Sequence, residues 1–317
     1  MGKVAFIFPG QGAQYVGMGK DFYDKFTVSR EVYEEANKSL NMDIAKMCFE
    51  GPDEELVKTE NTQPAILTTS VAMMRALENE GIDCDYTAGL SLGEYTALVK
   101  SKTFEFKDAV KLVKKRGKYM QEAVPEGKGG MAAILGLDFE YVLEAVERAS
   151  KVGIVEVANL NSPGQVVISG EIESLKAAVA EAQSLGAKKA VTLPVSAPFH
   201  SSLLKPAGEK LKKELIKVDL GKIEKKVITN VEAKPLENIE AVIPNLVKQV
   251  SSSVLWQDSV EYMLNEGVDV FVEIGPGKSL TSFVKRIAKA NNKEVTTLNV
   301  NDISSFEKTC EFFKKEA

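Results

Sequence analysis

The chain has 317 residues, of which 44% are hydrophobic and 27% charged, and its formal net charge is −5. These values are ordinary for a globular protein and give no global basic field, so we expect neither nucleic acid nor a membrane as partner. Its three cysteines, Cys48, Cys84 and Cys310, form no C-x-x-C pattern, which argues against a disulfide framework or a zinc site and fits a cytoplasmic protein.

Short apolar runs alternate with amphipathic stretches along most of the chain, which is typical of an α/β domain with a largely parallel sheet. The pattern predicts strands over residues 3–8, 85–89, 226–231 and 269–274. It predicts helices over residues 64–80, 106–123, 205–217, 256–266 and 279–290. Pro64 is expected in the first turn of its helix, where the missing N–H costs nothing.

Two glycine-rich turns need an interpretation. The turn after the first strand has Gly10, Gly12 and Gly17, which is not the G-x-G-x-x-G spacing of a dinucleotide site. The turn at 275–279 lacks the first glycine of a phosphate-binding loop, because Val272 stands there. We interpret both as turns at strand ends, which leaves a nucleotide-binding module as a disfavoured alternative.

The pentapeptide Gly89-Leu90-Ser91-Leu92-Gly93 lies between a predicted strand and a stretch that can open a helix at Glu94. A serine between glycines at such a junction is typical of a nucleophile elbow, which lifts the hydroxyl out of the sheet. The following backbone N–H then points to where an oxyanion would form. Ser91 is therefore a candidate nucleophile.

The helix predicted over 106–123 carries an arginine on its apolar face. Ala109, Val113, Arg116 and Met120 follow helical spacing, so Arg116 needs a partner where unpaired charge is costly. That partner is either a structural Asp or Glu or the carboxylate of a substrate, which guanidinium grips through two parallel hydrogen bonds.

Residues 128–195 have a different pattern. Strands are expected over 130–135, 154–159, 165–169 and 189–195, with helices near 139–150 and 172–184 and a turn at 161–164. This β-α-β-β-α-β order is the ferredoxin-like plan. We predict a small domain of residues 128–195 inserted into a large α/β domain of residues 1–127 plus 196–317.

The only histidine of the chain, His200, follows this insert in the segment Val195 to Ser201. A serine hydroxyl needs a base, and a Ser–His mechanism here would have to use His200. More than a hundred residues follow His200, including two predicted strands, whereas the histidine of an ordinary α/β-hydrolase lies near the end of its sheet. We therefore expect a Ser–His pair on another scaffold.

Several motifs in this order resemble those of the malonyl-CoA:acyl carrier protein transacylase family over nearly the whole chain. They are Phe8-Pro9-Gly10-Gln11-Gly12, Thr62-Gln63-Pro64-Ala65, Gly89-Leu90-Ser91-Leu92-Gly93-Glu94, Arg116-Gly117-Lys118-Tyr119-Met120, Asn161-Ser162-Pro163-Gly164-Gln165, Pro198-Phe199-His200-Ser201 and Glu273-Ile274-Gly275-Pro276-Gly277. One departure is Leu90, because the family commonly has histidine before the nucleophile. With Leu90 in that place, the substrate contacts and the polarity of the pocket are expected to differ from those of other family members, whereas the catalytic base is unaffected.

The resemblance implies an α/β-hydrolase-like large domain with a ferredoxin-like insert, and a site built around Ser91 and His200. It assigns the oxyanion hole to the backbone N–H groups of Gln11 and Leu92, and the substrate carboxylate to Arg116. It also implies that the Gln249 carbonyl orients the histidine. Further pocket residues are Gln63, Met120, Asn161 and Phe199.

The function that the resemblance implies is transfer of malonyl from malonyl-CoA, through a Ser91 ester, to the phosphopantetheine thiol of acyl carrier protein in fatty acid synthesis. No metal and no permanently bound cofactor is expected, and we expect a monomer. Two alternatives stay open: an acyltransferase that serves a polyketide pathway, and a serine thioesterase that uses water as acceptor.

Overall fold

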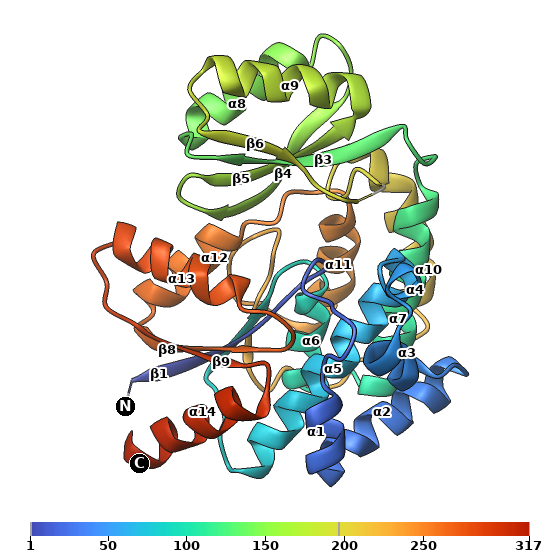
Figure 1. Cartoon of the computed structure of the whole chain (residues 1–317), viewed down its shortest axis with the longest axis vertical. Helices are drawn as coiled ribbons and strands as arrows, with labels where there is room; N and C mark the ends of the chain where they lie inside the picture. Colours follow the sequence, from blue (N-terminus) through green and yellow to red (C-terminus); the bar gives the residue numbers. More distant parts are fainter. Residues whose placement is uncertain (1, 196, 317) are drawn as a thin grey trace.

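The large part of the molecule is built on a five-stranded parallel sheet. A computed structural model describes residues 2–195 and 197–316, and its larger sheet has the strand order β7-β2-β1-β8-β9 (Figure 1). The strands are β1 (Lys3–Phe8), β2 (Tyr86–Gly89), β7 (Lys226–Ile228), β8 (Val268–Ile274) and β9 (Thr296–Val300). Every pairing in this sheet is parallel.

Helices cover both faces of this sheet. The helices of this part are α1 (Lys20–Lys25), α2 (Thr27–Leu40), α3 (Ile44–Glu50), α4 (Asp53–Leu56), α5 (Thr59–Asn79), α6 (Gly93–Lys100), α7 (Phe106–Glu122), α10 (Lys205–Leu215), α11 (Val242–Val250), α12 (Trp256–Asn265), α13 (Ser279–Ala290) and α14 (Ile303–Glu316), with short 3-10 turns at Ser202–Leu204 and Ile239–Ala241. Phe6 and Phe8 pack into one core cluster, while Ala5 and Ile7 pack into another on the opposite face. A strand buried on both faces has a continuous apolar sequence, which explains the run at 3–8.

The smaller sheet is antiparallel and lies at the top of Figure 1, with α8 (Phe139–Ala149) and α9 (Ile172–Ser184) on its outer face. Its strands are β3 (Gly129–Leu135), β4 (Val155–Ser162), β5 (Gln165–Glu171) and β6 (Lys189–Thr192). The strand order is β4-β5-β3-β6, so β5 lies between the two strands that α8 connects. This is the split β-α-β arrangement of the ferredoxin-like plan. The predicted fold class is thus confirmed.

The boundary between the two parts stays our proposal, with residues 128–195 as the insert and 1–127 plus 196–317 as the large domain. Residue 196, at this boundary, and residues 1 and 317 lie outside the described residues. None of the helices in the described ranges is long and apolar enough to cross a membrane.

The helix around Pro64 differs from the prediction. The helix α5 begins at Thr59, so Pro64 lies inside it and not in its first turn. Proline removes a backbone hydrogen bond there, but Thr59 to Gln63 are almost all buried, and α7 packs against them so closely that a Cβ on Gly117 would clash with the Thr59 carbonyl. Tertiary packing therefore extends the helix past a residue that usually limits it.

Three strands also differ from the prediction: β9 was not predicted, and β4 and β6 end at other residues than expected. The strand β9 is absent from the predicted set because its sequence, TTLNV, is mostly polar and half-buried at the sheet edge. The strand β4 continues to Ser162, so the hairpin turn is confined to Pro163 and Gly164, where Gly164 has a φ of 70°. The strand β6 ends at Thr192, three residues before the predicted end.

Candidate active site

Ser91 lies on a tight turn between β2 and α6. Its φ of 54° is in the left-handed region, which a non-glycine residue rarely adopts. Both glycines of the pentapeptide are needed for close approach: a Cβ on Gly89 would clash with the backbone of Gly93, and a Cβ on Gly93 would clash with the Phe8 carbonyl. Asn230 holds the turn, since its Oδ1 accepts from Ser91 N at 2.6 Å and its Nδ2 donates to Gly89 O at 2.7 Å. The turn therefore presents Ser91 in a fixed position.

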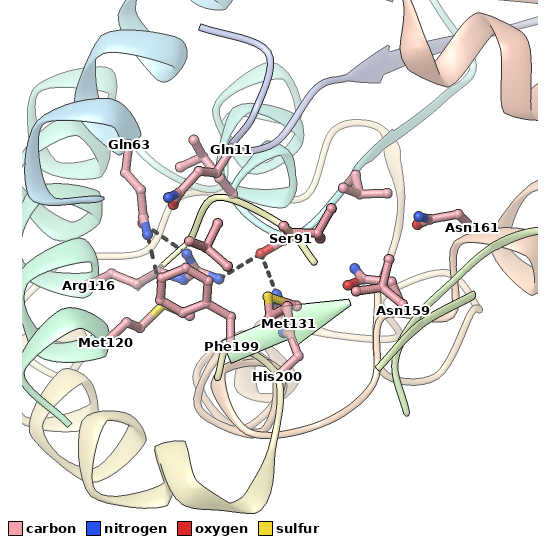
Figure 2. Close-up of a pocket in the computed structure, with 15 residues that line it drawn as sticks. Gln11, Gln63, Ser91, Arg116, Met120, Met131, Asn159, Asn161, Phe199 and His200 are labelled. Atoms are coloured by element: carbon pink, nitrogen blue, oxygen red, sulfur yellow. Dashed lines mark hydrogen bonds between the residues drawn. The ribbon is translucent and has the colours of Figure 1, made fainter. Parts of the chain in front are cut away.

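His200 contacts the serine hydroxyl directly. Ser91 Oγ lies 2.7 Å from His200 Nε2 (Figure 2). On the other side of the ring, His200 Nδ1 lies 2.9 Å from the backbone oxygen of Gln249. A carbonyl oxygen only accepts, so Nδ1 carries the proton and Nε2 is left to accept from the hydroxyl. In this geometry His200 can act as a base for Ser91, with its ring oriented by a backbone carbonyl where many serine enzymes use a carboxylate.

The histidine is kept neutral by its surroundings. Burial, and then the positive charge of Arg116, lower the pKa of His200 from 6.5 to about 4, while the hydrogen bonds to backbone carbonyls act in the opposite direction. Near neutral pH the imidazole is therefore unprotonated, which is the form that can take a proton from Ser91.

Arg116, on α7, reaches the same hydroxyl from the other side. Its Nη2 donates to Ser91 Oγ at 3.0 Å and to Gln249 Oε1 at 3.0 Å, and its Nη1 donates to Gln63 Oε1 at 2.8 Å. Its side chain also lies over the ring of Tyr95, 5.5 Å from the centroid.

These neutral partners bear on the question that the sequence left open about Arg116, because none of them is a structural Asp or Glu. The residue is 1% exposed, and none of the ion pairs between described residues includes it. Its Nε has no hydrogen-bond partner in that part of the chain. The hydrogen-bond partners of this buried guanidinium are amides and a hydroxyl, so no carboxylate is bonded to it and an anion that enters the site can pair with it.

The three groups meet in one cavity of about 170 Å³. Figure 2 shows Ser91 between Arg116 and His200, with the side chains of Gln63 and Met120 beside Arg116. The predicted pocket residues Gln63, Met120, Asn161 and Phe199 line this cavity, and so do the predicted oxyanion-hole residues Gln11 and Leu92. Gln249 does not line it and acts from behind Arg116 and His200. Sites for drug-sized ligands usually have about 300–1,000 Å³, so this cavity suits a short group.

Two residues of the cavity wall have backbone N–H groups without an acceptor among the described residues. Those of Gln11 and Leu92 donate no hydrogen bond to any other described residue, although both residues line the cavity. The side-chain amide of Gln11 donates to Thr59 Oγ1 at 3.3 Å, which holds this residue at the cavity wall. Two free donors beside a nucleophile are the arrangement that stabilises an oxyanion.

The small sheet supplies part of the cavity wall, of which the sequence interpretation predicted only Asn161. The additional lining residues are Leu90, Met131, Asn159, Val167, Leu193 and Val195. Asn159 could have been inferred, because it lies two residues before Asn161 on one strand and such residues share a face. The apolar members carry no comparable signal.

A second cavity of about 630 Å³ adjoins the first, since Leu193 and Val195 line both. It is bordered on the other side by the start of α5 and by residues of α7, among them Thr59 and Lys118. A ligand with a long arm could therefore place its end at Ser91 and its body in this larger space. Within the described ranges, no group of three or more His, Cys, Asp or Glu side chains could hold a metal ion.

Comparison with known proteins gives consistent results over almost the whole chain. The family described as acyl transferase domain matches residues 5–310. The malonyl CoA-acyl carrier protein transacylase of Bacillus subtilis is 44% identical over 317 residues, covering 100% of this chain and 99% of the relative. The protein of the same name from Escherichia coli K12 is 47% identical over 288 residues, covering 90% and 93%.

Solved structures agree with these sequence relatives. The crystal structure of the malonyl CoA-acyl carrier protein transacylase from Clostridium perfringens has a TM-score of 0.94 and 49% identity, covering 99% of this chain and 98% of that one. A malonyl-transacylase in complex with a type II PKS acyl-carrier protein has a TM-score of 0.94 and 41% identity, covering 98% and 99%.

Proposed function

Since the chain belongs to the acyl transferase domain family, we propose that it moves a malonyl group from malonyl-CoA to the phosphopantetheine thiol of acyl carrier protein. The observation that carries the site assignment is that His200 Nε2 and Arg116 Nη2 both contact the hydroxyl of Ser91. One group is a base, and the other is a cation that can bind the free carboxylate of the acyl group.

In the first half of the reaction Ser91 Oγ attacks the thioester carbonyl while its proton passes to His200 Nε2. The tetrahedral oxyanion accepts hydrogen bonds from the backbone N–H groups of Gln11 and Leu92. As the C–S bond breaks, coenzyme A leaves and takes the proton from His200. The product is a malonyl ester of Ser91.

In the second half the neutral His200 takes the proton of the phosphopantetheine thiol. The thiolate attacks the ester carbonyl, the bond from the acyl carbon to Ser91 Oγ breaks, and the proton returns to the serine. The Gln249 carbonyl keeps the imidazole in one tautomer through both halves, because it accepts from Nδ1 throughout.

Arg116 holds the malonyl carboxylate in this scheme. The guanidinium donates to Ser91 Oγ in the free enzyme, and it offers two parallel N–H groups to a carboxylate placed one methylene from the reacting carbonyl. The cavity of about 170 Å³ limits the acyl group to a short one, and the adjoining cavity has room for the pantetheine arm. Gln63, Met120, Asn161 and Phe199 complete the pocket.

We place this reaction in fatty acid synthesis in the cytoplasm. The test is to incubate the protein with radiolabelled malonyl-CoA and either a fatty acid or a polyketide carrier protein, and to measure labelled carrier and free malonate. Faster loading of the fatty acid carrier is expected. Loading of the polyketide carrier alone would move the enzyme to that pathway, and free malonate without loaded carrier would make it a thioesterase.

The rate of Ser91 acylation is expected to stay high well below pH 6.5 and to fall only near pH 4. The reason is that the pKa of His200 is lowered to about 4, so the imidazole keeps its basic form until the pH passes through that value. The positive charge of Arg116 disfavours protonation of His200, so Arg116→Met is expected to raise the pKa of His200. The acylation rate of this variant should therefore fall at a higher pH than that of the wild type. Rapid-quench mass spectrometry of the acyl-enzyme measures both profiles. A wild-type midpoint near 6.5 would contradict the lowered pKa of His200, and a rate that does not fall at all down to pH 4 would contradict its role as the base.

A further inference from the structure

Glu94 is a buried carboxylate behind the elbow for which the reaction scheme has no role. It lies in the first turn of α6, is 2% exposed, and belongs to none of the ion pairs between described residues. It is not among the residues that line the cavity, so it does not touch the acyl group. Any effect of Glu94 on the reaction is therefore indirect, through the groups that it contacts or through its charge near Arg116.

One oxygen of Glu94 accepts two hydrogen bonds. Its Oε2 accepts from the backbone N–H of Asn230 at 3.0 Å and from Gln249 Nε2 at 2.8 Å. Burial raises the pKa of Glu94 to about 7, while these two hydrogen bonds and the charge of Arg116 act to lower it. Both hydrogen bonds end on the same oxygen, so a proton on the other oxygen leaves them intact.

Gln249 connects Glu94 to the reacting groups. Its Nε2 donates to Glu94 and to the Ser91 carbonyl at 2.9 Å, its Oε1 accepts from Arg116 Nη2, and its backbone oxygen orients His200. A guanidinium only donates, and an ionised carboxylate only accepts. The amide therefore satisfies both neighbours in one orientation only, and a flipped amide would turn its NH₂ group toward Arg116.

We propose that Glu94 is a positioning residue for malonyl selection: it holds the Gln249 amide in the orientation whose oxygen keeps Arg116 at Ser91. This inference rests on the proposed function, in which Arg116 binds the malonyl carboxylate. An acyl group without a carboxylate forms no ion pair with Arg116 and therefore depends less on its position. Losing Glu94 therefore lowers the preference for malonyl-CoA over acetyl-CoA more than it lowers the common steps of acylation.

The test compares Glu94→Met with Glu94→Gln in acylation of Ser91 by malonyl-CoA and acetyl-CoA. Methionine fills a similar volume without an oxygen acceptor, and we expect the ratio of the two kcat/KM values to fall about tenfold, as for a lost hydrogen bond in a charged network. Glutamine at this position can offer one oxygen to both the Asn230 N–H and Gln249 Nε2. Glu94→Gln is therefore expected to keep the ratio of the two kcat/KM values within about threefold of the wild type.

Glu273 offers a matched control. It is a fully buried glutamate of β8 that accepts from the backbone N–H groups of Leu280 and Thr281 at the start of α13, away from the cavity. Glu273→Met is expected to lower thermal stability and leave the malonyl-to-acetyl ratio unchanged. A general loss of structure would lower both rates in both variants and would not move the ratio.

The outcomes separate this inference from the function on which it rests. A wild-type enzyme without malonyl preference would overturn the role of Arg116 and this inference together. A wild-type preference that persists in folded Glu94→Met, or that Glu94→Gln loses equally, would overturn the inference alone. If Glu94→Met does not fold, Glu94→Asp replaces it, because its carboxylate ends one methylene short of Gln249; an unchanged ratio there would also refute the inference.

Discussion

Replacing Ser91 with alanine is expected to abolish malonyl transfer and the acyl-enzyme together. Intact-protein mass spectrometry after incubation with malonyl-CoA should show one added malonyl group on the wild-type protein, on the peptide that contains Ser91. The same measurement on Ser91→Ala should show none. The rate of transfer should fall by about 10⁴-fold or more, which is the usual effect of removing a nucleophile.

Ser253 provides the control for this experiment, because its hydroxyl donates to the Val157 carbonyl and it does not line the cavity. Ser253→Ala should still acquire the malonyl group. A malonyl adduct that persists on Ser91→Ala after removal of free thioester would show that another residue is the nucleophile. Transfer that persists without any adduct would show that the phosphopantetheine thiol attacks the malonyl-CoA thioester directly.

Replacing Arg116 with alanine is expected to remove the preference for malonyl-CoA. The malonyl carboxylate would then be buried without a counter-charge, and truncating one partner of such a pair usually costs about 2–5 kcal/mol. The value of kcat/KM for malonyl-CoA should fall by about 10²-fold or more, while that for acetyl-CoA should fall much less. Steady-state kinetics with both thioesters measures the change.

Arg75 is a suitable control, since it lies on the exposed side of α5 and pairs with Glu78 at the surface. Arg75→Ala should behave as the wild type with both substrates. Equal losses for malonyl-CoA and acetyl-CoA in Arg116→Ala would assign Arg116 to the positioning of Ser91, which it contacts at 3.0 Å, and not to the carboxylate. Unchanged selectivity between malonyl-CoA and acetyl-CoA would refute the proposed contact between Arg116 and the malonyl carboxylate.

The predicted elements show where sequence patterns are sufficient. The run at 3–8 is apolar on both faces because β1 is the central strand of a covered parallel sheet, and the structure has it at the predicted bounds. The helix of Arg116 also has nearly its predicted ends, because its amphipathic pattern is strong. The edge strand β9 and the first turn of α5 were missed, since their sequences are polar and only their neighbours favour the observed structure.

The sequence by itself determined the fold class, the elbow around Ser91 and the arginine on an apolar helix face. These features depend on short-range order: alternation along a strand, periodicity along a helix, and glycines that allow a close approach. Residue types and spacing express all of them directly. The motif order also indicated the family, because most of the motifs mark turns or strand ends around the site, and the other two lie on α5 and α7.

Only the tertiary structure decided what these residues contact. Ser91, Arg116, His200 and Gln249 lie on four separate segments, and no spacing rule predicts that they meet through hydrogen bonds of 2.7–3.0 Å. The same holds for the neutral partners of Arg116 and for the buried position of Glu94. Long-range packing fixes these contacts, and a buried charge is costly without them, so the pairing of polar groups inside the molecule is where the structure added most.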